Sequence, residues 1–180
     1  MSCVYRWRYG WVGAIALVVL LFTGLGGTTL AARPTATIAY AKSGHTLAVL
    51  AALSPDLPAS AIRLEGIQAP DLQQVPWGEA ARDCLAPLRE AVVALETEDW
   101  SADQYDRLWA YVWAGKQLVN RDLLAQGCAY LAGDRLAQGQ HHTALLYAQE
   151  SARLLGLGIW NPAQPLRETP ETFRRRSPTP

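Results

Sequence analysis

The chain has 180 residues, of which half are hydrophobic, and this length fits one domain with short extensions. Residues 33–180 carry 14 Lys and Arg against 16 Asp and Glu, so their net charge is −2. Nucleic-acid binders usually present a basic surface because phosphate contacts dominate their affinity. The composition therefore excludes a broadly basic domain and leaves only a local basic patch as a route to such a ligand.

The N-terminal segment has the pattern of a targeting sequence. Residues 9–32 contain no charged side chain, and Arg6 and Arg8 precede them. A basic start, an apolar run and small residues at 31–32 predict a secretory signal. The run is also long enough to cross a bilayer, which needs about 20 apolar residues, and Arg6 and Arg8 would then keep the N-terminus inside. Both interpretations place the domain outside the cytoplasm, either exported (periplasmic or extracellular) or on a single-pass anchor.

Short β-type segments and three helical patterns follow in chain order. The expected strands are residues 35–40, 46–53, 61–67, 92–98 and 108–113, and the expected helices are 79–88, 120–126 and 143–155. Three strands, a helix and two further strands favour an α+β fold, the five-stranded Greek-key barrel of the OB type, with about three helices. We expect a signal peptide or anchor over 1–33, the domain over 34–162 and an irregular tail over 163–180.

Individual residues carry local expectations. Gly44 should supply a positive φ in the turn before the second strand, and Asn120 should cap the second helix, which Gly127 ends. Cys84 and Cys128 either pair in an oxidising compartment or are two small buried side chains. The remaining expectation concerns His141 and His142, which should lie in a solvated loop; a zinc site with His45 lacks supporting ligand spacing.

Four stretches resemble the staphylococcal nuclease family in the right order. They are KSGHTL at 42–47, IRLEGIQAPD at 62–71, DQYDRLWAYV at 103–112, and the segment 119–129 that begins Val-Asn and ends Gly-Cys-Ala. The family patterns are Asp-Gly-Asp-Thr, Arg-Leu-x-Gly-Ile-Asp-x-Pro-Glu, Asp-x-Tyr-Gly-Arg-x-x-Ala-Tyr, and Val-Asn followed by Gly-x-Ala. The resemblance covers about residues 36–160 and implies the OB fold and calcium-dependent cleavage of phosphodiester bonds.

The resemblance places the calcium ligands at positions that have lost their carboxylates. Calcium prefers oxygen ligands, carboxylates above all. His45 and Gln68 stand where the family has its two aspartates, and Ser43 replaces the first aspartate of the turn. Asp71 stands in place of the glutamate proposed as general base and is one methylene shorter, although a base must come within about 3 Å of its water. We therefore assign no cofactor to this chain, and we expect its calcium-dependent cleavage to be impaired or absent.

The phosphate-binding arginines, in contrast, are present. Arg63 and Arg107 match the two arginines that clamp the phosphate and stabilise transition-state charge, and Tyr105 matches a nucleotide contact. Either arginine could instead be a structural ion pair, with Asp103 or Glu65 as partner. Asp106 replaces the usual glycine and would oppose phosphate binding, or pair with Arg107 itself.

An aromatic strand and three functions complete the interpretation. Trp109, Tyr111 and Trp113 share one face of a strand and are either core residues or, if exposed, a base-stacking surface. The leading hypothesis is an extracytoplasmic domain that retains anion capture, with nucleic acid or another phosphate-bearing ligand as partner, and membrane contact if the N-terminal segment is uncleaved. The alternatives are a metal-dependent nuclease that recruits another metal through His45 and Asp71, and a protein-interaction module.

Overall fold

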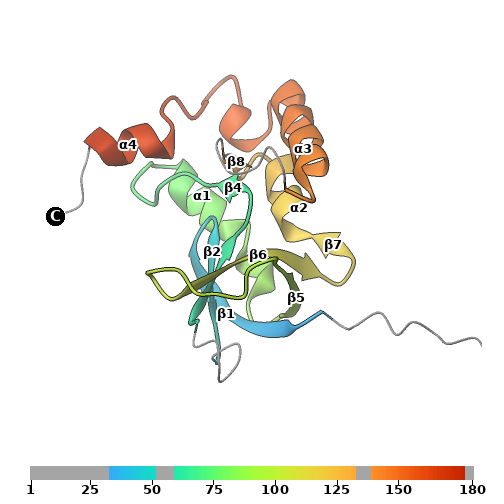
Figure 1. The fold of residues 1–180 in the computed structure, drawn as a ribbon. Helices are drawn as coiled ribbons and strands as arrows, with labels where there is room; N and C mark the ends of the chain where they lie inside the picture. The colour runs from blue at the N-terminus through green and yellow to red at the C-terminus, as the bar shows by residue number, and fades with distance from the viewer. Residues whose placement is uncertain (1–32, 52–58, 133–138, 177–180) are drawn as a thin grey trace, which may run out of the picture. The chain divides into compact units, whose positions relative to one another are not determined.

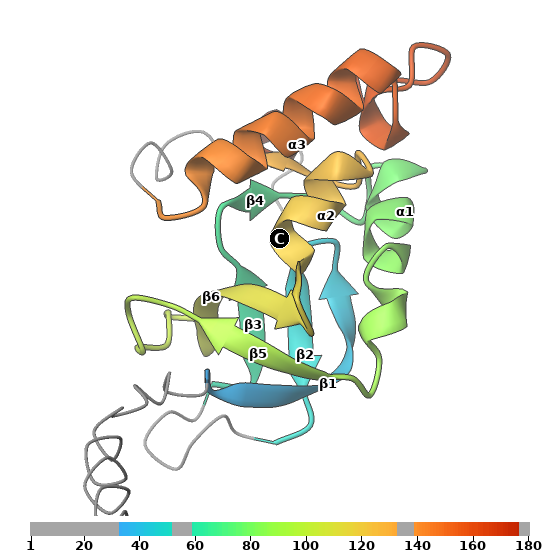
Figure 2. The ribbon, with the colours of Figure 1, turned by 90° about the vertical axis from the view of Figure 1, so that its right-hand side faces the viewer.

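The fold is a closed five-stranded barrel. One helix runs along its side, and others cover one of its ends (Figures 1 and 2). The computed structural model describes residues 33–51, 59–132 and 139–176. The barrel strands are β1 (Thr35–Ser43), β2 (Thr46–Val49), β3 (Ala61–Leu64), β5 (Val92–Glu96) and β6 (Arg107–Ala114). Neighbouring strands pair in the order β3-β2-β1-β5-β6, and a parallel β3–β6 pairing closes the ring. The α+β, OB-type barrel expected from the sequence is thereby confirmed.

Alternating side chains build the core of this barrel. Leu108, Ala110 and Val112 of β6 are all at most 1% exposed. They share the interior with fully buried residues of the other strands, such as Ile38, Leu47 and Ile62. Side chains of period two on a closed sheet leave the barrel filled rather than hollow. Functional side chains must therefore lie on its outer surface or at its ends.

Short helices and two small ladders complete the domain. These elements are β4 (Ile67–Gln68), α1 (Trp77–Asp83), the 3₁₀ helix η1 (Ala86–Leu88), β7 (Gln117–Leu118), α2 (Val119–Ala125), β8 (Tyr130–Leu131), α3 (His142–Leu155), the 3₁₀ helix η2 (Gly158–Trp160) and α4 (Pro170–Arg176). β4 pairs with β8 outside the barrel. In Figure 2, α1 runs alongside the barrel, and α3 lies across α2 at its end.

Two local expectations are wrong because tertiary contacts decide them. Gly44 does not have positive φ; a Cβ there would lie 2.6 Å from Cβ of Ala81 and 2.7 Å from that of Ala69, so glycine lets α1 approach the turn. Asn120 does not cap α2, whose N-cap is Leu118. Its buried amide instead accepts from the Val112 N–H (2.9 Å) and donates to the Glu65 carbonyl (2.7 Å). Asn120 thus ties β6 to the β3–β4 turn.

Two further corrections concern the C-terminal third. The tail is not irregular throughout, because residues 170–176 form α4. His141 is not solvated: its Nε2 lies 3.0 Å from the Glu96 carboxylate, and its ring packs edge-on against Tyr111. His142 begins α3 with a buried Nδ1. An acidic partner and an aromatic neighbour distant in sequence hold the His141 ring in place.

Cys84 and Cys128 form a disulfide, the first of the two alternatives open for this pair. Cys84 ends α1, and Cys128 follows Gly127, whose φ of +68° ends α2. The bond joins segments 44 residues apart in sequence. It therefore fixes α1, which packs against the β1–β2 turn at Gly44, to the end of the barrel where α2 lies.

The part of the chain that the structure describes contains no helix long and apolar enough to traverse a bilayer. The proposed signal or anchor falls on residues 1–33, and 1–32 lie outside the described residues. The choice between the two therefore stays a prediction.

Candidate functional site

The side chains singled out from the sequence converge from five segments. His45 lies in the β1–β2 turn, Arg63 on β3, Gln68 on β4, Asp71 in the following loop and Arg107 on β6. Hydrogen bonds join the first three of them. The parallel β3–β6 pairing places Arg63 opposite Trp109, and the two arginines meet over the ring of that tryptophan. Asp71 keeps to its own loop, where its Oδ1 accepts the Gln73 N–H at 3.1 Å.

Arg63 is the inner arginine of the site and is only 3% exposed. Its guanidinium donates to the carbonyls of Leu64 (2.8 Å) and Ile67 (2.9 Å), to that of His45 (3.4 Å) and to Oε1 of Gln68 (3.1 Å). Burial, followed by the positive charge of Arg107, lowers the pKa of Arg63 to about 10. Arg63 therefore remains a cation at neutral pH and holds the β3–β4 turn in shape.

Trp109 is in contact with both Arg63 and the outer arginine, Arg107. The ring centroid of Trp109 lies 4.9 Å from Cζ of Arg63 and 5.9 Å from that of Arg107. Arg107 also stacks on Tyr105, at 4.9 Å. Cations favour the faces of aromatic rings, so Trp109 offsets part of the repulsion between these two like charges.

Asp103, rather than Asp106, pairs with Arg107. Its Oδ2 accepts from Nε (2.8 Å) and Nη2 (2.7 Å) of Arg107 and from Nε1 of Trp109 (3.0 Å). Burial would raise the pKa of Asp103, but these bonds and those from two backbone N–H groups lower it to about 2. Asp106 has φ +55° and takes the left-handed conformation suited to the glycine it replaces. Of the partners considered for Arg107, Asp103 therefore forms the ion pair, and Asp106 does not.

His45 is a neutral imidazole in this site. Its Nδ1 accepts the Ala69 N–H at 3.1 Å, which requires that nitrogen to be unprotonated. Burial, then the charge of Arg63, lowers the pKa of His45 to about 3. A proton on this ring would break the hydrogen bond and be repelled by the charges of Arg63, Arg174 and Arg107.

The residues at the family's metal positions do not fit a calcium ion. His45 uses its Nδ1 for a backbone N–H, and Gln68 uses its only side-chain oxygen for Arg63. Asp71 is then the single carboxylate among the three, whereas calcium takes six to eight oxygen ligands. Across residues 33–51, 59–132 and 139–176, no group of three His, Cys, Asp or Glu side chains is placed to hold a metal.

The aromatic strand divides into buried and surface parts. Tyr111 is buried, and Trp113 donates to Glu96 at 2.7 Å, so both act in packing. Trp109 is half-buried between the arginines, and Tyr105 is 65% exposed. Of the aromatic side chains considered for base stacking, those that reach the surface are therefore Tyr105 and, beside it, Trp109.

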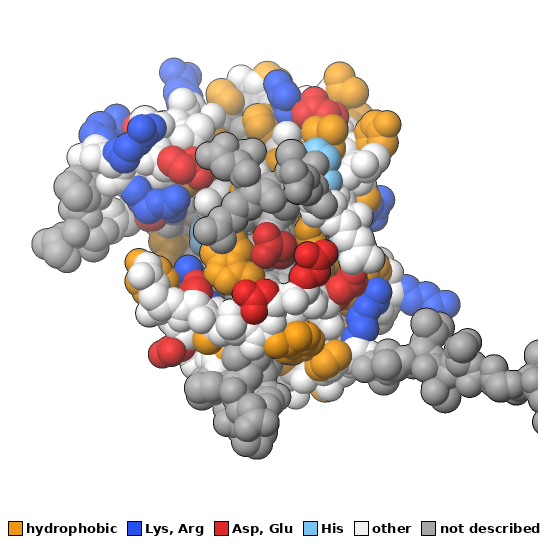
Figure 3. All heavy atoms as spheres, in the orientation of Figure 1, with side chains coloured by type: hydrophobic (Ala, Val, Ile, Leu, Met, Phe, Trp, Pro, Cys, Tyr) orange, Lys and Arg blue, Asp and Glu red, His pale blue; other side chains and the backbone are white. Residues whose placement is uncertain are grey.

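A hollow of about 520 Å³ lies beside Trp109. Its wall carries five carboxylates, which belong to Glu65, Glu96, Glu98, Asp99 and Asp103. Figure 3 shows acidic side chains gathered in the middle of this face. Such a wall repels phosphate, and Arg63 and Arg107 do not line it, so the hollow is not the anion site.

Sequence reasoning missed two contacts of this site. The position of Trp109 between the arginines follows from the parallel β3–β6 register, which no local pattern shows. Tyr130 is the second: its backbone pairs with Gln68, and its hydroxyl donates to Glu171 of α4 at 3.0 Å. For the ion pair of Asp103 and Arg107, in contrast, the spacing of four residues in the sequence was an available signal.

Comparison with known proteins identifies relatives of this barrel. The family model described as "Staphylococcal nuclease homologue" matches residues 61–162, which include Arg63, Gln68, Asp71 and Arg107. An "Uncharacterized endonuclease" of Haemophilus influenzae is 28% identical over 160 residues, 88% of this chain and 83% of that protein. The "Thermonuclease" of Staphylococcus hyicus is 29% identical over 106 residues, 56% of this chain and 62% of that protein.

Proposed function

We propose a function for this chain from the premise that it belongs to the staphylococcal nuclease family. In this proposal it is an extracytoplasmic domain that binds phosphodiester groups through Arg63 and Arg107. Its calcium-dependent cleavage is impaired or absent. One observation carries the proposal: the atoms of His45 and Gln68 that could bind a metal already accept hydrogen bonds within the protein. Nδ1 of His45 accepts the Ala69 N–H, and Oε1 of Gln68 accepts from Arg63. The neutral His45 and the bound Gln68 offer no charge to attract a divalent cation.

The two arginines have different parts in the proposed anion capture. Arg63 supplies fixed positive charge from a buried position and keeps the turn rigid. Arg107 makes the contact: about a quarter of its side chain is exposed, and its bonds to Asp103 use Nε and Nη2 and leave Nη1 for a phosphate oxygen. Tyr105, exposed and stacked on Arg107, would accept a base beside that phosphate.

The loss of catalysis follows from the size of the missing terms. Removing one preorganised electrostatic contributor costs about 10²–10³ in rate. Two metal carboxylates are replaced here, and the carboxylate of Asp71 is shorter and accepts a backbone N–H of its own loop. The expected calcium-dependent rate is therefore lower by several orders of magnitude than that of a site with both aspartates.

The disulfide supports the proposed location. Disulfides persist in oxidising compartments and are rare where thiols are kept reduced. The Cys84–Cys128 bond and the apolar N-terminal run of the sequence agree with export or anchoring. N-terminal sequencing of the protein from a membrane fraction separates the two, since a product that begins near Arg33 would contradict the anchor.

The test is cleavage and binding of DNA and RNA by the purified protein beside an Arg107→Ala variant. Calcium, manganese and zinc are each compared with a chelator. We expect no calcium-dependent cleavage and oligonucleotide binding that falls about tenfold in the variant, as for loss of a charge-assisted phosphate contact. Unchanged binding in Arg107→Ala would refute the proposed anion site.

The names of the relatives favour a second candidate, an active nuclease. This function requires a metal other than calcium, recruited through His45 and Asp71. Cleavage that appears with manganese or zinc and disappears in both Arg107→Ala and Asp71→Asn would establish it. Loss in Arg107→Ala alone would indicate a nuclease that does not use Asp71.

A further inference from the structure

The C-terminal helix α4 lies outside residues 61–162 and is fastened to the site. Nε2 of Gln74 donates to the Glu168 carbonyl at 2.8 Å, and the Tyr130 hydroxyl donates to the Glu171 carboxylate at 3.0 Å. Arg176 closes an ion pair with Glu168 at 2.7 Å. The segment is thus attached both to the loop after β4 and to β8.

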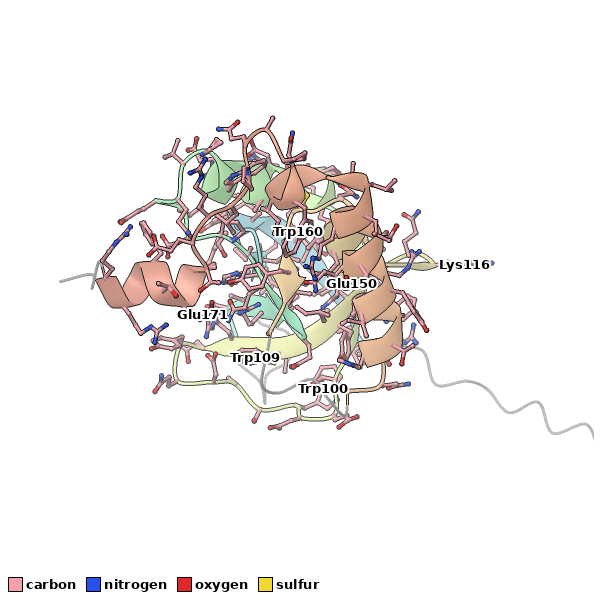
Figure 4. All side chains as sticks on the ribbon, turned by 90° about the horizontal axis from the view of Figure 1, so that it is seen from above. Trp100, Trp109, Lys116, Glu150, Trp160 and Glu171 are labelled. Carbon is pink, nitrogen blue, oxygen red and sulfur yellow. A yellow bond between two sulfur atoms is a disulfide. The ribbon has the colours of Figure 1, made fainter. Side chains whose placement is uncertain are left out.

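Continuous contacts lead from α4 to the inner arginine. Tyr130, which holds Glu171, pairs through its backbone with Gln68, and Oε1 of Gln68 accepts from Arg63. Arg174 follows one turn after Glu171, at 4.0 Å from its carboxylate. In Figure 4, Glu171 extends from α4 toward the barrel on the side where Trp109 is labelled.

The positive charge of Arg174 acts on the same residues. After burial and Arg63, Arg174 is the next cause of the low pKa of His45, ahead of Arg107. It also lowers the pKa of Arg63, after burial and Arg107. Arg174 itself is 44% exposed, so its guanidinium faces solvent within the field of the site.

Charge is divided between the barrel and this segment. Residues 33–162 carry 10 Lys and Arg against 14 Asp and Glu, whereas residues 163–180 carry four against two. Figure 3 shows Lys and Arg side chains grouped where α4 lies in Figure 1. A polyanion at Arg107 would therefore be opposed by the net negative charge of residues 33–162 and favoured by the net positive charge of the segment that carries α4.

We propose that Arg174 is a further phosphate-binding residue, which together with Arg107 holds neighbouring phosphates of one strand and so makes a single-stranded polynucleotide, rather than an isolated phosphate, the preferred ligand. The inference rests on the proposed anion site at Arg63 and Arg107. Glu168 is bound to Arg176, and Glu171 accepts the Tyr130 hydroxyl. Glu171 also pairs with Arg174, but at 4.0 Å on an exposed surface, so it offsets the charge of Arg174 only in part.

The experiment compares Arg174→Ala with Arg175→Ala in the full chain. Arg175→Ala is the matched control, because it removes the same charge from the same helix. Nη2 of Arg175 donates to the Thr172 hydroxyl at 3.3 Å. Binding of a labelled oligothymidylate is followed by fluorescence anisotropy in chelator over a salt series, and binding of inorganic phosphate by calorimetry. Thermal melting of each variant verifies folding.

We expect Arg174→Ala to weaken oligothymidylate binding about 5–10-fold and to reduce the salt slope by about 0.7, the value for one contact on a single strand. Inorganic phosphate should bind as in the parent, and Arg175→Ala should change neither ligand's affinity by more than about twofold. Equal effects of the two substitutions would overturn the role of Arg174. If Arg107→Ala then still loses both ligands, only this inference fails; if it binds both as the parent does, the proposed function fails with it.

Discussion

Opening the Cys84–Cys128 disulfide tests how the domain is held together. The bond closes a loop of 44 residues. In the chain-entropy treatment this loop restricts the unfolded state by about 13 cal/mol/K, or about 4 kcal/mol at 25 °C. Residues 33–180 comprise 148 residues, whose unfolding entropy is roughly 0.3 kcal/mol/K. The expected fall in Tm is therefore about 13 °C.

The assay is thermal and urea unfolding of the purified protein with and without a reductant that does not absorb in the far ultraviolet. Cys84→Ser/Cys128→Ser gives the same state genetically, and Cys3→Ser is the matched control, because Cys3 is the third cysteine of the chain. Thiol counting by mass spectrometry under each condition verifies which bond is open. The double variant should melt about as low as the reduced protein.

A fall in Tm of less than about 3 °C with both thiols shown to be free would refute the reasoning. It would mean that the unfolded chain is already restricted near these residues, or that the pair does not form in solution. A large fall in the Cys3→Ser control would instead point to an intermolecular bond. In either case the argument for an oxidising compartment would lose its structural support.

Three other predictions concern the site. The pKa of His45 is about 3 in the folded state and 6.5 in the unfolded state, so only the unfolded state takes up this proton as the pH falls from 6.5. The contribution of His45 to the free energy of unfolding is therefore complete above pH 6.5, and by pH 5 it should be lower by about 2 kcal/mol. Urea titrations at the two pH values should find this loss in the parent protein and not in His45→Asn. Arg63→Ala leaves the carbonyls of Leu64 and Ile67 without their donor and should cost about 3–5 kcal/mol, against about 1 kcal/mol for Arg107→Ala, as measured by denaturant unfolding; equal losses would contradict the buried role of Arg63. The double change His45→Asp/Gln68→Asp should weaken oligonucleotide binding in chelator and create calcium-dependent binding or cleavage; unaltered behaviour in calcium would show that more than these two carboxylates is missing.

Local patterns in the sequence predict much of this barrel. The alternation of Leu108, Ala110 and Val112 is visible in the sequence, and all three are buried. Gly127 ends α2 with positive φ, as expected of a glycine after a helix. Such features depend on neighbours in the chain, so one sequence suffices to predict them.

Other features depend on partners that no local pattern reveals. Asn120 bridges groups 8 and 55 residues away and therefore does not cap its own helix. His141 is held by Glu96, 45 residues earlier. The disulfide required a distance between two helix ends, and α4 is a seven-residue helix that is too short to be stable without contacts such as Tyr130–Glu171.

The two substitutions that remove the calcium ligands also change what the arginines can do. With neutral side chains in place of two aspartates, the net charge of the site is more positive by two. Both positions, His45 and Gln68, lie beside the Arg63 guanidinium. With the aspartates, the field of the arginines would be largely balanced until a cation arrived. Without them, the carboxylates that act on Arg63 are those of Glu65 and Asp103, and Asp103 is bound to Arg107, so the charge balance of the site shifts toward an anion. The proposed loss of the metal and the proposed phosphate binding are therefore physically linked, and this link is why the restored aspartates should weaken binding in chelator.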